Sequence, residues 1–267
     1  MSRNLRLPEI LDIARRDGRV SVDALAEHFD VTAQTIRRDL GELADAGKLE
    51  RVHGGALLPS GVANIGYEDR RGLNDAAKAA IAARCAQDIP EGCSIFLNIG
   101  TSTEAVARAL LKHKDILVLT NNMNVANILV DNPECDVIVV GGLLRRVDGG
   151  LVGTLTMQAI RAFKFDLAVI GCSALDDEGD MLDFDIQEVG VSQTIIDCAR
   201  KTFLVADHSK FQRRAPARIG SLRQVNAFYT DKAPPRSVID ACREWGTGLC
   251  IADSAESIDP QAASAAG

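Results

Sequence analysis

The chain has 267 residues, of which 46% are apolar and 25% charged, so one large or two moderate globular domains are expected. It has no apolar run of about 18 residues and its first residues carry charges throughout, which argues against a membrane span or a secretory signal. Seven scattered cysteines and four separate histidines predict neither a disulfide framework nor a metal site. A net charge of −7 argues against a generic nucleic-acid binder. Because the chain shows no secretory signal and its cysteines are typical of a reducing compartment, we expect a cytoplasmic protein, without cofactor or metal.

Residues 1–58 form the first expected domain, a compact helical unit. Apolar residues at helical spacing predict a first helix that ends at Gly18. Ser21 is expected to cap a second helix, and a tight turn at Asp30-Val31 leads to a third helix, from Thr32 to Gly47. The segment "KLERVHGGA" alternates apolar and polar residues, which predicts a two-stranded ribbon. This order of elements is that of a winged helix-turn-helix.

The third helix opens with "TAQTIRRDL", in which two adjacent arginines flank an apolar stripe. In a helix-turn-helix the second helix of the motif enters the major groove, and arginine is the commonest partner of guanine. The candidate DNA-binding residues are Thr32 at the helix N-cap, Gln34, Thr35 and Arg38 near base edges, Arg37 on phosphate, and Arg51 and His53 of the ribbon on the flanking backbone. The alternative is that Arg37 and Arg38 form a solvated face paired with Asp39 and Glu42.

The segment "VSVDALAEHFDVTAQTIRRDLGELADAGKLERVHGGA" closely resembles the DNA-binding domain of DeoR-type bacterial transcriptional regulators, above all in "TIRRDL" and "RVHGGA". The resemblance implies that the arginines belong to a recognition helix and that the partner is operator double-stranded DNA. Because one winged helix reads only a short half-site, at least a dimer is expected, and the resemblance suggests a tetramer.

Residues 59–75 carry Pro, Gly and Asn without periodicity and predict a linker. Residues 76–252 alternate helical stretches with short apolar runs, which predicts an open α/β domain with a mostly parallel sheet. Five such runs are the expected strands: "CSIFLNIG", "ILVLTNN", "CDVIVVGG", "FDLAVIGC" and "TFLVADH". Residues 253–267 are rich in Ala and Ser and predict a disordered tail.

Polar residues follow several of these strands, at the edge where open α/β sheets bind ligands. The run Gly100-Thr101-Ser102-Thr103 at a helix start predicts an anion site, although simple capping by Thr101 or Ser102 is the alternative. Lys210 is the best candidate for a phosphate counter-charge, whereas Arg145 and Arg146 are expected in solvent or at a subunit interface. The other candidate effector-binding residues are Thr120, Asn121, Asn122, Gly141, Gly142, Asp148, Glu188 and Asp207, for several of which turn chemistry is the alternative.

The second half resembles the DeoR-type sensor domain, which is related in fold to ribose-5-phosphate isomerase, through "IGTSTEAVA", "LTNNMNVA", "VVGGLLR", "FDLAVIG" and "VADHSKF". The segments "RRVDGGLVG" and "DFDIQEV" look most like family members that control glycerol phosphate genes. The resemblance therefore implies a repressor released by a small phosphorylated metabolite, specifically sn-glycerol 3-phosphate. Control of another sugar-phosphate pathway stays open, as does activation in place of repression.

The related fold also raises an enzyme as an alternative, an aldose–ketose phosphate isomerase with Glu188 as its base. The chain lacks the Asp-Gly-Ala-Asp and glycine-rich Lys segments by which the isomerases resemble one another. Its phosphate loop also has Gly-Thr-Ser-Thr in place of Gly-Thr-Gly-Ser-Thr. We therefore predict a regulator with no catalytic residues.

Overall fold

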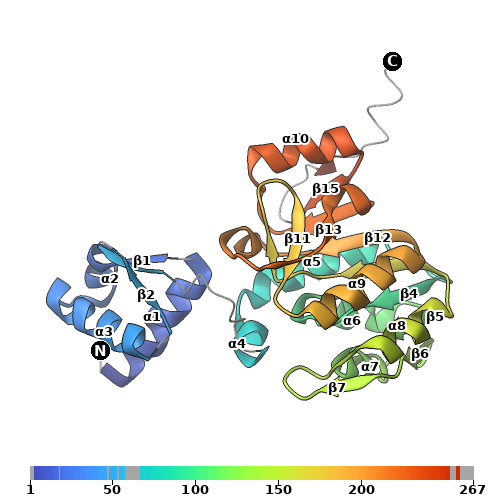
Figure 1. Ribbon diagram of the computed structural model, residues 1–267, viewed down its shortest axis with the longest axis horizontal. Coiled ribbons are helices and arrows are strands. Elements are labelled where there is room, and N and C mark those ends of the chain that lie inside the picture. Colours follow the sequence, from blue (N-terminus) through green and yellow to red (C-terminus); the bar gives the residue numbers. More distant parts are fainter. Residues whose placement is uncertain are drawn as a thin grey trace.

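The computed structural model describes residues 3–17, 19–46, 48–52, 54–57, 67–252 and 257–258. Its first part is a winged helix-turn-helix of three helices and a three-stranded sheet in the order β1-β3-β2 (Figure 1). The elements are α1 (Arg3–Asp17), β1 (Arg19–Ser21), α2 (Val22–Phe29), α3 (Ala33–Asp45), β2 (Glu50–Val52) and β3 (Gly55–Leu57). No helix within the described residues is long and apolar enough to cross a membrane.

Short polar side chains fix the ends of the two motif helices. Ser21 caps α2 by accepting a hydrogen bond from the backbone N–H of Ala24 at 3.1 Å, as the sequence predicted. Asp30 ends α2 in the left-handed conformation, with φ 51°, and Thr32 caps α3. The apolar faces of the three helices meet in one core that includes Ile10, Leu25, Phe29, Ile36 and Leu40.

The wing has one more strand than predicted. The two-stranded ribbon is present as β2 and β3, and β1 pairs with β3 on its other side. A Cβ on Gly55 would lie 1.9 Å from the carbonyl oxygen of Val20, so only glycine permits this close pairing. A strand of three residues is too short to give a periodic signal, which is why the sequence did not indicate β1. Gly18, Gly47 and His53 lie outside the described residues.

The second part is an α/β domain built on an eight-stranded sheet in the order β16-β15-β14-β12-β9-β4-β5-β6, in which only β16 runs antiparallel. Together with the winged helix-turn-helix, this sheet confirms the predicted fold class. Its strands are β4 (Ser94–Leu97), β5 (Ile116–Thr120), β6 (Cys135–Val139), β9 (Phe165–Ile170), β12 (Ala199–Val205), β14 (Ala227–Thr230), β15 (Gly248–Ile251) and β16 (Ser257–Ile258).

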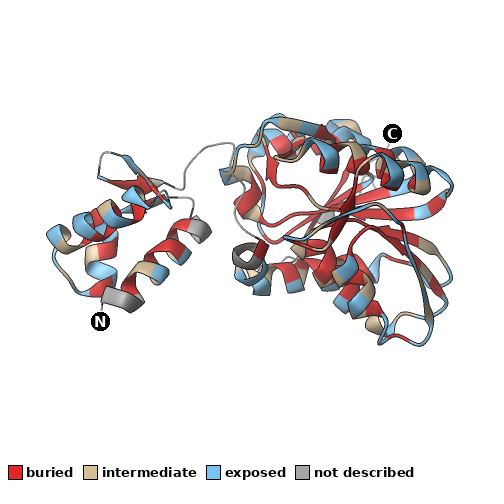
Figure 2. Ribbon diagram, turned by 60° about the horizontal axis from the view of Figure 1, so that its bottom comes forward, coloured by how far each residue is buried: buried red, intermediate tan, exposed pale blue. Residues whose placement is uncertain are grey.

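Helices cover both faces of this sheet, and buried residues concentrate along its strands (Figure 2). On one face the core includes residues of α5 (Asp75–Gln87), α6 (Thr101–Ala109) and α7 (Met123–Leu129). On the other face it includes residues of α8 (Thr154–Arg161), α9 (Ile186–Cys198) and α10 (Arg236–Trp245). The remaining short helices are α4 (Tyr67–Gly72), η1 (Leu110–Lys112), η2 (His208–Gln212) and η3 (Leu222–Gln224).

The chain order reverses between β4 and β9. From β4 the chain continues outward to β5 and β6, whereas from β9 it continues in the other direction to β12, β14 and β15. Open α/β sheets bind ligands at the carboxyl ends of the strands beside such a reversal. The topology therefore points to the segments that follow β4, β9 and β12.

All five predicted strands are present, and the structure adds elements that the sequence did not indicate. A small sheet joins β10 (Ala174–Leu175), β11 (Asp180–Asp183) and β13 (Ala217–Ser221), and a hairpin joins β7 (Leu143–Arg145) and β8 (Gly150–Val152). Within the expected linker, residues 67–72 form α4, which packs on α6. Within the expected tail, β16 pairs with β15, whereas residues 59–66, 253–256 and 259–267 lie outside the described part.

The hairpin leads to a prediction about two neighbouring glycines. A Cβ on Gly142 would lie 1.8 Å from Oγ1 of the buried Thr156, at a φ of +156°, whereas Gly141 has open space. Gly142→Ala is expected to lower the free energy of unfolding by about 1–3 kcal/mol, the usual range for overpacking. Gly141→Ala, the matched control, should change it by less than about 0.5 kcal/mol. Urea unfolding followed by circular dichroism measures both, and equal stability of the two variants would contradict the argument.

Candidate functional site

The third helix presents a polar face away from its core. Ile36 and Leu40 are buried, whereas Gln34, Arg37 and Arg38 are exposed. The hydroxyl of Thr32 accepts a hydrogen bond from the backbone N–H of Thr35 at 3.3 Å and lies 3.0 Å from the Thr35 hydroxyl. Thr32 and Thr35 thus shape the start of α3, and Arg51 on β2 is exposed as well.

The carboxylate beside the two arginines has another partner. Asp39 is buried and pairs with the Nε of Arg6 on α1 at 2.5 Å. Neither Arg37 nor Arg38 forms an ion pair within the described part of the chain. The pairing of these arginines with Asp39 is therefore wrong, whereas a solvated face stays the alternative to contacts with a DNA backbone or base edge.

In the α/β domain, α6 begins at the carboxyl end of β4 without a side-chain cap. Its N-cap is Gly100, with φ 145°, and no side chain accepts a hydrogen bond there. The hydroxyl of Thr103 donates to the carbonyl oxygens of Asn98 and Gly100 and shapes the turn. The hydroxyls of Thr101 and Ser102 make no hydrogen bond within the described residues, so the capping alternative does not explain them. Helix starts with free N–H groups and hydroxyls suit an anion.

A buried lysine follows β12, two strands away from β4. Lys210 is 8% exposed, and its ammonium group has no hydrogen-bond or ion-pair partner among the described residues. Burial, together with the positive charges of Arg213 and Arg70, lowers the pKa of Lys210 to about 8, although the charge of Asp207 opposes the shift. Buried ammonium groups usually have a counter-ion. The unpartnered Lys210 is therefore the strongest sign of an anion site.

Two arginines that the sequence analysis did not single out lie near Lys210. Arg213 follows η2, and Arg70 comes from α4; Arg213 Nη1 and Arg70 Nε are buried without a partner among the described residues. Burial lowers the pKa of Arg213, as does the charge of Arg70, while Asp207 raises it. We call Arg70, Lys210 and Arg213 the cation cluster. Neighbouring like charges of this kind favour a multiply charged anion.

Asp207 is a carboxylate whose charge acts on Lys210 and Arg213, but one of its oxygen atoms is already engaged. Its Oδ1 accepts hydrogen bonds from the N–H and the hydroxyl of Ser209 and from Nδ2 of Asn74, the last at 2.9 Å. Burial alone would raise the pKa of Asp207, but Lys210 and the bonds from Ser209 and Asn74 lower it to about 2. Asp207 thus keeps its charge and fixes the loop that carries Lys210.

The residues after β5 are buried and hold the backbone of the sheet edge. Thr120 donates to the carbonyl of Leu97 at 2.7 Å, and Asn121 donates to the carbonyl of Leu151 at 3.0 Å. Asn122 caps α7 and donates to the carboxylate of Glu104 at 3.3 Å. All three are fully buried, and the hydrogen bonds that they make are those by which Thr and Asn side chains commonly stabilise turns. Their assignment to effector binding stays a prediction.

Arg145 lies at the centre of a carboxylate network, not in solvent as expected. Its guanidinium bonds Asp148 at 2.5 and 2.9 Å, Asp185 at 2.7 Å and Glu188 at 2.6 Å. Burial raises the pKa of Glu188 to about 7, with Asp183 adding to the rise and Arg145 opposing it. The structure thus brings Asp148 and Glu188 together. Arg146 is exposed, and so is Gly141, while Gly142 packs against α8 through Thr156.

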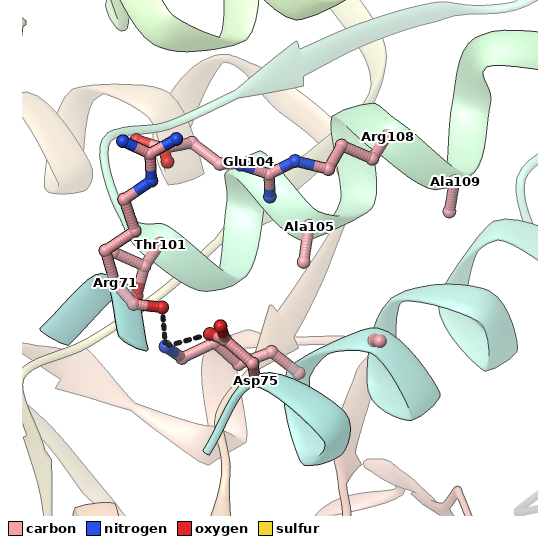
Figure 3. A pocket seen from close by; sticks show the side chains of 9 residues that line it. Arg71, Asp75, Thr101, Glu104, Ala105, Arg108 and Ala109 are labelled. Carbon is pink, nitrogen blue, oxygen red and sulfur yellow. Dashed lines mark hydrogen bonds and ion pairs between the residues drawn. The ribbon is translucent and has the colours of Figure 1, made fainter. Parts of the chain in front are cut away.

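A separate cavity of about 530 Å³ opens between α5 and the start of α6. It is lined by residues that include Arg71, Lys78, Thr101, Glu104 and Arg108, and the side chains of Arg71 and Arg108 extend toward each other above α6 (Figure 3). Lys78 donates to the backbone carbonyls of Arg70 and Arg71. Because Asp207 and Arg213 act on its pKa, which burial lowers, Lys78 lies near the cation cluster too.

The described residues contain no group of three metal-binding side chains, and all seven cysteines are free thiols. A winged helix with exposed arginines, joined to an α/β domain that carries a cation cluster, is the architecture of a DNA-binding regulator with a ligand-binding domain.

Comparison with known proteins places the chain in a family. A DeoR-like helix-turn-helix domain matches residues 6–62, and a DeoR C-terminal sensor domain matches residues 73–232. The glycerol-3-phosphate regulon repressor of Escherichia coli K12 is 44% identical over 239 residues, which cover 90% of this chain and 95% of the relative. The repressor of the same name from Haemophilus influenzae is 41% identical over 251 residues, 94% and 98% of the two chains. The chain belongs to the DeoR family of transcriptional regulators.

One further relative in sequence and one solved structure extend the comparison. The transcriptional repressor CsqR of E. coli is 39% identical, over 88% of this chain and 90% of the relative. Among solved structures, ribose 5 phosphate isomerase A from Neisseria gonorrhoeae overlaps 51% of this chain and 53% of its own, at 14% identity and a TM-score of 0.37. The relatives in sequence are named as repressors, so the chain is a regulator and not an isomerase.

The exposed arginines of α3 lead to a prediction about DNA. Arg38→Ala is expected to relax operator selectivity by about 1–3 kcal/mol, the usual value of a bidentate base contact. Arg37→Ala should weaken binding to all sequences alike and reduce the salt slope by about one unit. Fluorescence anisotropy on operator and scrambled duplexes at several salt concentrations measures both effects. If both variants fold and bind DNA like the wild type, Arg37 and Arg38 do not contact DNA and belong to a solvated face of the helix.

The buried Lys210 leads to a prediction about pH. Its pKa of about 8 in the free protein should rise when a phosphate binds, because the negative charge favours the ammonium form. Effector affinity is therefore fully present below pH 8 and should fall above it, by up to about tenfold per pH unit. Calorimetry between pH 7 and pH 9.5 in a series of about half-unit steps tests this. Lys210→Met should bind weakly with no such slope, whereas a flat wild-type profile would exclude Lys210 from the site.

Proposed function

We propose that the chain is a transcriptional repressor whose sensor domain binds sn-glycerol 3-phosphate and then releases operator DNA. The observation that supports a phosphate ligand is the cation cluster of Arg70, Lys210 and Arg213. Arg70 Nε, Arg213 Nη1 and the Lys210 ammonium group have no hydrogen-bond partner among the described residues. The uncapped start of α6, with Thr101 and Ser102, adds donors at the end of β4, two strands away. The choice of glycerol 3-phosphate and of repression follows the names of relatives that are 41–44% identical.

The carboxylate network offers groups suited to the glycerol part of this effector. Asp148 and Glu188 are acceptors, and alcohol hydroxyls donate hydrogen bonds to carboxylates. Arg70 connects the carboxylate network with the cation cluster. Its Nη2 lies 3.8 Å from Asp148, and its charge acts on both Glu188 and Lys210. A ligand with a phosphate at one end and hydroxyls at the other matches this order of groups.

On the DNA side, α3 carries the proposed contacts: Gln34, Thr35 and Arg38 to base edges, Arg37, Arg51 and His53 to the backbone, and Thr32 to hold the helix start. One winged helix covers a short half-site, so we propose a homo-oligomer, at least a dimer, on a two-fold operator. Operator DNA and metabolic phosphate esters both occur in the cytoplasm, where we place this function.

Release requires an effector that binds the low-affinity conformation better than the DNA-bound one. Saturating sn-glycerol 3-phosphate is therefore expected to weaken operator binding roughly 5–150-fold, the usual range of allosteric coupling. Glycerol should have no effect, because a neutral triol leaves the cation cluster unpaired. Anisotropy titrations on the upstream region of the protein's own operon, with each compound, measure this.

A matched variant separates effector binding from DNA binding. Thr101→Ala combined with Ser102→Ala should leave operator affinity unchanged and remove the response, since only the sensor loses hydrogen-bond donors. Release by fructose 1-phosphate and not by glycerol 3-phosphate would keep the family and reject the effector. Operator binding that no phosphorylated metabolite changes would reject the sensor role altogether.

A further inference from the structure

The short helix α4 (Tyr67–Gly72) is the first described element after the segment that joins the two domains. It packs on α6 through a buried tyrosine. The hydroxyl of Tyr67 donates to the carboxylate of Glu104, 3.0 Å from each oxygen, and accepts a hydrogen bond from Nδ2 of Asn124 at 2.9 Å. The same Asn124 group lies 3.0 Å from Glu104 and from the carbonyl of Asp148. The start of α4 is therefore fixed to the first turn of α6 and to the hairpin loop.

The other end of α4 is also attached to residues of the proposed effector site. Lys78 donates to the carbonyls of Arg70 and Arg71, the last residues of the helix before Gly72. Asn74, which follows α4, donates to Asp207 at 2.9 Å. The described anchors of this segment thus lead to α5, α6 and α7 and to the loops that carry Asp148 and Lys210.

Arg70 lies between these anchors with an incomplete set of partners. Its Nη2 is 3.8 Å from Asp148, a carboxylate that Arg145 already binds at 2.5 and 2.9 Å. Its Nε is buried without a partner among the described residues. Its charge reaches both Lys210 and Arg213. A phosphate between the three cations would offer Arg70 charge-assisted hydrogen bonds that Asp148 does not supply.

We infer that Arg70 is a ligand of the effector phosphate, and that α4 is the element through which effector binding reaches the DNA-binding domain. In the effector-free state Tyr67 and Glu104 hold α4 in the arrangement that accompanies operator binding. A phosphate draws Arg70 away from Asp148 and toward Lys210 and Arg213, and α4 moves with it. Because α4 directly follows the interdomain segment, its movement changes how that segment leaves the sensor. The inference rests on the proposed function and adds the residue and the route of regulation.

The first test removes the anchor. If α4 anchoring belongs to the DNA-binding state, Tyr67→Phe should weaken operator binding without effector roughly tenfold to hundredfold, the size of one hydrogen bond to a charged group. By linkage, the same variant should bind sn-glycerol 3-phosphate more tightly, not more weakly, than wild type. A merely destabilised protein would lose both affinities. Tyr229→Phe is the matched control, because its hydroxyl donates to Asp88 at 2.8 Å at the far end of α5.

The second test locates the phosphate. Arg70→Gln should lower the affinity for sn-glycerol 3-phosphate at least about tenfold, whereas the neighbouring Arg71→Gln should change it less than twofold. Both arginines come from α4, but Arg71 is exposed and lines the cavity between α5 and α6 (Figure 3). Loss of affinity in Arg71→Gln alone would place the phosphate in that cavity and overturn the inference.

Wild-type protein in the same titrations separates this inference from the proposed function. If sn-glycerol 3-phosphate does not release wild-type protein from the operator, the proposed effector is wrong. If wild-type protein is released and Tyr67→Phe and Arg70→Gln both behave as wild type, the effector stands and the role of α4 is wrong. Weaker operator binding with tighter effector binding in Tyr67→Phe, together with the loss in Arg70→Gln, supports both parts.

Discussion

The central constraint on this sensor domain is the burial of positive charges that lack enough carboxylates. Lys210 is 8% exposed without a partner in the described residues, and Asp207, whose charge acts on it, already accepts three hydrogen bonds. Charges buried in this way cost free energy that the rest of the fold must offset. The reversal of strand order between β4 and β9 puts this arrangement where an α/β sheet is open to ligands. We therefore propose that an anion bound at this edge of the sheet stabilises the cluster.

Arginine has opposite roles in the two halves of the chain, and the position of nearby carboxylates decides which. Arg6 of α1 forms a buried ion pair with Asp39 of α3, and this leaves Arg37 and Arg38 of α3 exposed and without a carboxylate partner in the described residues. In the sensor, Arg145 is bound by Asp148, Asp185 and Glu188, so its donors are already used. An arginine without a carboxylate is free to bind phosphate, and one within a carboxylate network orders the acceptors around it. This difference cannot be read from the identity of the residue.

The parts of the fold that the sequence predicted are those with local or strongly periodic signals. Capping by Ser21 and Thr32, the buried face of α3 and five apolar strands follow from spacing alone. The strands β1, β7, β8, β10 and β11 have two to four residues, too few for a period to show. Lys210 stood out because it follows a strand. Arg70 and Arg213 did not, since Arg70 lies in a segment without periodicity and the loop of Arg213 approaches α4 only through tertiary folding.

The cation cluster and the carboxylates near it would allow the proposed site to distinguish a phosphorylated polyol from inorganic phosphate. Phosphate alone would satisfy Lys210 and Arg213, but it would leave Asp148 and Glu188 with Arg145 as they are. A ligand that adds hydroxyls supplies donors to those carboxylates, and Glu188, with its pKa raised to about 7 by burial and Asp183, gains most from them. Arg70 contacts the carboxylate of Asp148 at 3.8 Å, and its charge also acts on the ammonium group of Lys210. A ligand that engages both groups therefore changes the surroundings of Arg70 more than a phosphate ion does, and only a difference between states of this kind shifts a conformational equilibrium.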